Sequence, residues 1–334
     1  MPHPAAFPPI LAIVAVLACA GLFIWFYQAL FPRPARWLLV GLAFPLGIGV
    51  TALYVWLLAP RAAGLGAITD TWSALRMMVL AAGLPEEAVK LTATAAAMLV
   101  CFRGLRPAEA FQASLFAALG FAAIENAHYA RMFPEIALPV AIGRGIAASF
   151  VHSMMGMMQG FFLAELVRSG WRRWHLPVLG YLVAAVAHAL FNWGLIRPVL
   201  EYLQTKQMRI ETITQSLWVA VPCILAVIAL SITLFCWELR RSAREDPITS
   251  EAAHQKKVAR WHRTGDVMIV VGGMGFIGSL VLAFFMARAL EGQPQPTELA
   301  DVTPENLRAS AIMTVAVAVS PVVALFGVLV RNKQ

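Results

Sequence analysis

Residues 10–31 read ILAIVAVLACAGLFIWFYQALF, a run of 22 residues without a charged side chain. A helix crosses the apolar core of a bilayer, which is about 30 Å thick, with about 20 such residues. This stretch therefore predicts a membrane-spanning helix. Residues 37–59 repeat the pattern after a short connection that carries Arg33 and Arg36, so two crossings are expected near the start of the chain.

The whole chain has the composition of a membrane protein. Of its 334 residues, 60% are hydrophobic and 13% are charged, whereas a soluble domain is roughly one quarter charged. We therefore expect an all-α fold, a polytopic transmembrane bundle of about nine helices that forms a single membrane domain over residues 1–334. The expected helices cover residues 10–31, 37–59, 86–102, 107–130, 138–167, 174–196, 216–239, 267–290 and 309–330.

The distribution of Lys and Arg predicts the orientation of this bundle. The net charge of +8 comes mostly from short connections, and the connections richest in Lys and Arg face the cytoplasm when the N-terminus lies outside and the C-terminus inside. Residues 240–265 then form a basic cytoplasmic loop, and residues 266–334 form accessory helices. The N-terminus lacks the basic region of a cleavable signal, so the first helix is expected to be retained.

Residues 71–84, which precede Pro85, are too short to cross the bilayer alone. Two arrangements remain open for them. They form either a re-entrant arm or the first half of one helix that is kinked at Pro85.

Charged and strongly polar side chains within the expected helices are few and clustered, and a charge at the centre of such a helix costs ~2.5 to 3.5 kcal/mol on insertion scales. Residues four apart share a face of a helix, and the glycines of the series His152, Gly156 and Gly160 would let another helix approach closely. The third to sixth helices carry Glu86, Glu87 and Lys90, then Glu125 and Asn126, then Arg144 and His152, and finally His188 and Asn192.

The depth of four of these residues is similar. Counted from the cytoplasmic helix ends at 1.5 Å per residue, all four lie about 21 to 27 Å into the membrane. They are therefore expected to line one water-accessible chamber in its outer half. The four residues are Glu86, Glu125, His152 and His188.

Such a chamber holds the groups that peptide hydrolysis needs. A glutamate beside a histidine can take a proton from water, and His188 with Asn192 can stabilise an oxyanion. A zinc ion held by His152, His188 and either Glu86 or Glu125 is the alternative. Because no helix carries a His-Glu-x-x-His pair, we favour the mechanism without metal or other cofactor.

The same residues form four ordered motifs on successive helices. The motifs are Glu86-Glu87-x-x-Lys90, Gly120-Phe121-Ala122-x-x-Glu125-Asn126, Arg144 to His152-x-x-x-Gly156, and His188-x-x-x-Asn192. Together they resemble the PrsW family of intramembrane proteases, which is related to the CAAX prenyl proteases and to bacteriocin-immunity membrane proteins. The resemblance covers residues 72–196, the expected catalytic core.

This resemblance implies an endopeptidase of the bacterial inner membrane that cleaves a membrane-associated protein, such as an anti-sigma factor. Its partners would be that protein or peptide substrate and the lipid bilayer. The implied catalytic residues are Glu86, Glu87, His152, His188 and Asn192. The implied supporting residues are Glu125, Asn126, Lys90 and Arg144.

Structural roles are the competing interpretation of each group. Two acids after Pro85 are typical of a helix N-terminus, and Lys90 is expected to pair with Glu86. Glu125 could join two helices by a hydrogen bond. Arg144 could anchor its helix at the outer boundary of the membrane.

Two other classes of protein remain open. Buried glutamates and histidines also form proton relays in transporters, although the inverted repeat typical of many transporters is missing from the sequence. A non-enzymatic scaffold would use the basic loop 240–265 to bind anionic lipid or a cytoplasmic partner. Gly273 to Gly278 match the GxGxxG pattern of a dinucleotide site, but they lie in an apolar spanning segment. We expect no nucleotide and no nucleic acid as a partner.

Overall fold

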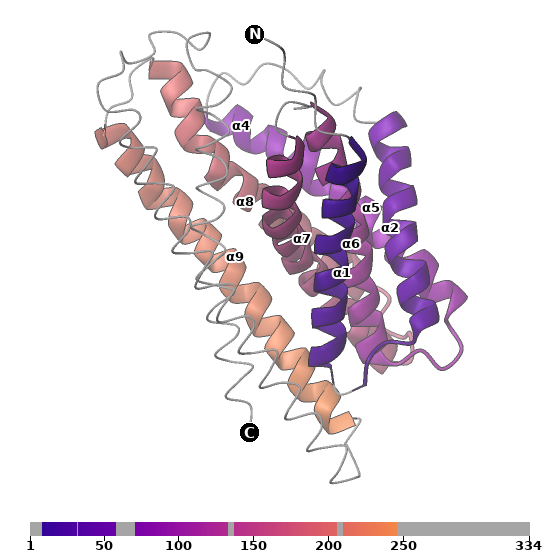
Figure 1. The fold of residues 1–334 in the computed structure, drawn as a ribbon. Helices are drawn as coiled ribbons and strands as arrows, with labels where there is room; N and C mark the ends of the chain where they lie inside the picture. Colours follow the sequence, from indigo (N-terminus) through magenta and orange to yellow (C-terminus); the bar gives the residue numbers. More distant parts are fainter. Residues whose placement is uncertain (1–8, 32, 58–70, 133–136, 206–209, 246–334) are drawn as a thin grey trace.

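The computed structural model describes residues 9–31, 33–57, 71–132, 137–205 and 210–245. Within these ranges the regular structure is entirely helical, which confirms the expected all-α fold (Figure 1). The long helices are α1 (Pro9–Leu30), α2 (Trp37–Leu57), α6 (Pro107–Met132), α7 (Ala137–Arg168), α8 (Leu176–Thr205) and α9 (Ile210–Glu245).

Five helices in the described part of the chain are long and apolar enough to cross a membrane: α1, α2, α6, α7 and α8. Seven of the nine predicted helices coincide with an observed helix, and of these only residues 58–59 of the predicted helix 37–59 lie outside the described residues. The predicted helices at 267–290 and 309–330 lie outside the described residues, as does the GxGxxG stretch. The count of nine and the orientation of the termini therefore stay predictions.

Residues 71–100 follow one continuous helical path. The segment α4 (Thr71–Met77) leads into a π-helical segment, η1 (Met78–Gly83), and then into α5 (Leu84–Val100). Of the two arrangements left open for residues 71–84, the structure therefore shows the first half of a distorted helix.

The distortion lies in η1, just before Pro85. The amide of Leu84 donates to the carbonyl of Val79, five residues earlier instead of four. Pro85 has no amide hydrogen, so the carbonyl of Ala81 lacks its usual α-helical donor. The hydroxyl of Tyr54 on α2 donates to this carbonyl at 3.3 Å, and a neighbouring helix thereby satisfies the group that the proline leaves free.

Helix α6 lies inside the bundle, with 89% of its apolar span buried, compared with 28% for the span of α2. Two glycines of α7, Gly156 and Gly160, approach its backbone closely. A Cβ atom added at Gly156 or Gly160 would lie 3.0 or 2.8 Å from a backbone carbonyl oxygen of α6. The expectation that these glycines admit another helix is therefore confirmed.

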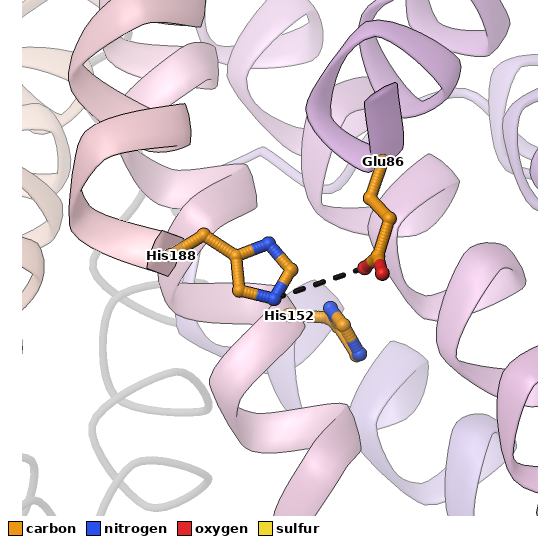
Figure 2. Close-up of side chains that lie close together, drawn as sticks. All are labelled: Glu86, His152 and His188. Atoms are coloured by element: carbon orange, nitrogen blue, oxygen red, sulfur yellow. Dashed lines mark ion pairs between the residues drawn. The ribbon is translucent and has the colours of Figure 1, made fainter. Parts of the chain in front are cut away.

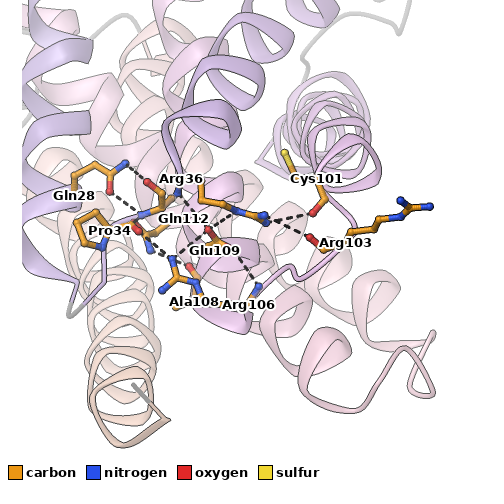
Figure 3. Close-up of polar contacts among 10 residues, drawn as sticks. Gln28, Pro34, Arg36, Cys101, Arg103, Arg106, Ala108, Glu109 and Gln112 are labelled. Carbon is orange, nitrogen blue, oxygen red and sulfur yellow. Dashed lines mark hydrogen bonds and ion pairs between the residues drawn. The ribbon is translucent and has the colours of Figure 1, made fainter. Parts of the chain in front are cut away.

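A polar layer joins the start of α6 to the connection between α1 and α2 (Figure 3). Fully buried Glu109 accepts a hydrogen bond from Nε of Arg36 at 2.9 Å and from Arg106 at 3.1 Å. The side-chain oxygens of Gln28 and Gln112 both accept a hydrogen bond from the backbone amide of Ala35 in this connection, at 2.9 and 3.0 Å. The sequence alone had not drawn attention to this layer.

A second set of ion pairs, here called the Arg168 cluster, joins the ends of α7 and α9. Arg168 lies 2.6 Å from Glu238, 2.6 Å from Glu245 and 3.0 Å from Glu165. Arg241 also pairs with Glu165. Because the side chain of Glu238 is fully buried, this cluster fixes α9 against the rest of the bundle.

Candidate active site

Four helices bring together the polar side chains that the motifs contain. They meet just after η1, where Pro85 opens α5 and places the two glutamates in its first turn. We call this set the Glu–His cluster. Its members are Glu86, Glu87 and Lys90 of α5, Glu125 of α6, His152 of α7 and His188 of α8.

Glu87 is fully buried and both of its carboxylate oxygens have partners. One oxygen lies 2.5 Å from Nζ of Lys90 and 2.8 Å from Nδ1 of His188. The other accepts a hydrogen bond from Gln159 at 2.8 Å, and the same amide donates to the Glu87 carbonyl at 3.0 Å. Glu87 is therefore held rigidly and holds His188 in turn.

Glu86 has a different environment, although it is the adjacent residue. Its side chain is 14% exposed, and its buried Oε2 atom has no hydrogen-bond partner among the described residues. This oxygen lies 3.7 Å from Nε2 of His188 (Figure 2). A buried polar atom without a hydrogen bond costs about 1 to 3 kcal/mol, and this oxygen is therefore a candidate for binding a ligand or a reacting molecule.

His152 is bound on both ring nitrogens. Its Nε2 atom lies 2.8 Å from Glu125, and its Nδ1 atom lies 3.0 Å from Nζ of Lys90. The ring also packs edge-on against that of His188, with 5.4 Å between the centroids, and against Phe121 at 4.9 Å. The position and orientation of this imidazole are therefore strongly constrained.

Arg144 contacts the cluster through Glu125. Its guanidinium donates to Glu125 at 3.0 Å and lies 3.7 Å above the ring of Tyr129. The amide of Asn126 donates to the Arg144 carbonyl at 3.2 Å. Arg144 therefore holds Glu125, and a role as a lipid anchor alone does not describe it.

The expected partner of Lys90 is wrong, and the expected role of Asn192 stays untested. Lys90 pairs with Glu87, three residues before it, and not with Glu86, four residues before it. Asn192 follows His188 by one turn of α8, but its side chain makes no hydrogen bond to another described residue. Its role towards an oxyanion therefore stays a prediction, as does the water-accessible chamber.

Sequence reasoning missed Gln159 as a neighbour of the site. It lies seven residues after His152, a spacing that returns to the same face of a helix, and this spacing was the available signal. A glutamine side chain in a membrane helix can equally well join two helices by a hydrogen bond. The residue type alone therefore did not mark Gln159 as part of the site.

Three members of the cluster have the residue types and the proximity of a metal site. One ligand atom each from Glu86, His152 and His188 lies within 4.8 Å of the other two. Two histidines and a glutamate are a known ligand set of catalytic zinc. The Glu87 carboxylate on the far nitrogen of His188 is the typical outer partner of a metal-binding histidine. The residues present therefore fit a metal ion.

The fold and the Glu–His cluster define a multi-pass helical membrane protein with a buried glutamate–histidine site. The family model described as PrsW family intramembrane metalloprotease matches residues 33–228, which include the whole cluster. The chain belongs to this family of intramembrane proteases. No curated protein and no solved structure matches it.

Proposed function

We propose that this chain is an intramembrane metallopeptidase that hydrolyses a peptide bond of a membrane-associated protein. One observation carries the proposal: the unpartnered oxygen of Glu86 faces Nε2 of His188, and His152 lies beside them. The family description as metalloproteases supports it. In this respect the proposal departs from the metal-free mechanism that sequence reasoning favoured.

Glu86, His152 and His188 would hold the metal ion. When bound, the ion activates a water molecule and polarises the carbonyl of the scissile peptide bond. The protein orients the side chains that would bind the ion. Since Nδ1 of His188 donates its hydrogen to the Glu87 carboxylate, Nε2 carries the lone pair, and this nitrogen faces Glu86.

The remaining members of the cluster support these three residues. Lys90 and Gln159 hold Glu87, and Arg144 holds Glu125, which lies against Nε2 of His152. The partial exposure of the Glu86 and Glu125 side chains, 14% and 20%, supports access of water and substrate from this side of the cluster.

A second candidate function is a glutamate-type peptidase without metal. The observation that favours it is the position of Lys90, which lies 3.0 Å from Nδ1 of His152, so that both nitrogens of this histidine already have partners. In this mechanism Glu86 takes a proton from water, and His188 stabilises the charge that develops on the substrate.

Metal analysis and an activity assay on the purified full-length protein distinguish the two mechanisms. The metallopeptidase is expected to contain one zinc ion per chain and to lose cleavage of a membrane-protein substrate in a chelator, with recovery when zinc is returned. Full activity in a metal-free, chelator-treated sample would contradict it and favour the glutamate type. A protein that cleaves nothing but moves protons, or that binds a partner irrespective of E86Q, would be a transporter or a scaffold.

We infer from the expected orientation that the cut lies near the outer face of the bacterial inner membrane, in a substrate such as an anti-sigma factor. The orientation is testable in a cysteine-free background with R103C and R172C, which lie in exposed connections. Both cysteines should react with a membrane-impermeant thiol reagent only after the cells are permeabilised. Labelling of both cysteines in intact cells would show the opposite orientation and would place the cut near the cytoplasmic face.

A further inference from the structure

The two histidines of the Glu–His cluster are held in the same way. Nδ1 of His188 lies 2.8 Å from Glu87, and Nε2 of His152 lies 2.8 Å from Glu125. A histidine that binds a metal usually donates the hydrogen of its other nitrogen to a carboxylate. The ligand nitrogens should therefore be the two that do not face these carboxylates, Nε2 of His188 and Nδ1 of His152.

These two ligand nitrogens have different surroundings. Nε2 of His188 faces the unpartnered oxygen of Glu86 at 3.7 Å. Nδ1 of His152 lies 3.0 Å from Nζ of Lys90. A lysine ammonium can only donate, so its hydrogen bond uses the lone pair through which Nδ1 would bind a metal. Figure 2 shows one nitrogen of the His152 ring turned toward Glu86 and His188.

We propose that Lys90 occupies the ligand nitrogen of His152 in the metal-free protein, and that metal binding displaces its ammonium from this nitrogen. The inference rests on the proposed metallopeptidase function. Lys90 is almost completely buried, and it keeps two other partners when it leaves His152: the Glu87 carboxylate at 2.5 Å and the face of the Phe121 ring at 4.4 Å.

Lys90 is thus a positioning residue with two consequences. Through this hydrogen bond it fixes the tautomer and the orientation of His152, because Nδ1 accepts and Nε2 donates. During loading it competes with the metal for one of the three ligands, so the free energy of this hydrogen bond is subtracted from the free energy of metal binding. Replacement of Lys90 by a side chain without a donor should therefore tighten metal binding.

The test compares K90M with R144M in the full-length protein. Each variant removes one positive charge from the cluster, but Arg144 contacts Glu125 and Tyr129 and no ligand nitrogen. Zinc dissociation constants are measured by competition with a chromogenic chelator. We expect K90M to bind zinc about 10-fold more tightly than the wild type, because no donor then occupies Nδ1 of His152, whereas R144M should show no such gain. Equal affinities of the two variants would show an effect of charge alone and would overturn the inference.

A second comparison covers the case in which K90M fails to fold, since it leaves the buried Glu87 carboxylate without its cation. The double variants E87Q/K90M and E87Q/K90Q both remove the two charges, but only K90Q keeps a side chain that can donate to Nδ1 of His152. E87Q/K90M is therefore expected to bind zinc about 10-fold more tightly than E87Q/K90Q. If all variants bind zinc equally well, the inference is wrong and the metallopeptidase stands. If none of them binds zinc, the proposed metal site itself is wrong.

Discussion

Glu86 and Glu87 are adjacent in the sequence, but their side chains have different environments. Both oxygens of the Glu87 carboxylate have hydrogen-bond partners, whereas the Oε2 atom of Glu86 makes no hydrogen bond and only faces Nε2 of His188 at 3.7 Å. Spacing along helices predicted that both would lie near the histidines. It could not separate them, because neighbouring residues on a helix differ by about 100° in direction, and the rotation of α5 is set by η1 and by contacts with other helices.

The variants E86Q and E87Q should therefore have different effects, the first on cleavage and the second on stability. E86Q removes a charge that no described hydrogen bond compensates, so it should lower cleavage by about 100-fold or more and leave the thermal unfolding midpoint unchanged. E87Q leaves buried Lys90 without its anion, which should destabilise the protein by about 3 to 5 kcal/mol. The measurements are a cleavage assay and thermal unfolding in detergent. Equal loss of stability in both variants would contradict the distinct roles.

At the scale of elements, hydropathy predicted where helices lie better than where they end. Helix α8 continues to Thr205 and α9 covers Ile210–Glu245, whereas the predicted segments were 174–196 and 216–239. The predicted basic loop at 240–265 accordingly begins inside α9. Hydropathy detects only the apolar part of a helix, and backbone hydrogen bonds continue beyond it. The π-helical turn could not be foreseen, since the Tyr54 hydroxyl that completes it comes from another helix.

The contact between η1 and α8 gives a prediction for an element. A Cβ added at Gly83 would lie 2.5 Å from the Ala185 carbonyl oxygen, so G83A must push α8, and His188 with it, away from α5. We expect lower cleavage and a lower unfolding midpoint. The matched control is G49A, because nothing lies within 4 Å of a Cβ at Gly49, and it should behave like the wild type. Unchanged cleavage in G83A would show that this contact does not position His188.

At the scale of the whole molecule, polar groups occupy two separate levels of the bundle. Glu109 precedes Glu125 by 16 residues, and Arg168 follows His152 by 16 residues. At 1.5 Å per residue, both are about 24 Å from the Glu–His cluster. Since α6 and α7 are packed closely along their glycine contacts, the ion pairs at the far level can stabilise the bundle without contact with the reacting groups.

This separation predicts that stability and catalysis respond independently to changes at the far level. R168M removes the partner of the fully buried Glu238 and the links to Glu165 and Glu245. Loss of one partner of a buried pair costs about 3 to 5 kcal/mol, so the unfolding midpoint should fall clearly. Cleavage per folded molecule, measured well below that midpoint, should stay at the wild-type level because the Glu–His cluster keeps all of its contacts. R244M, at an exposed position of α9, should alter neither quantity. A loss of cleavage in R168M at a temperature where it is fully folded would instead show that the position of α9 affects the Glu–His cluster through α7.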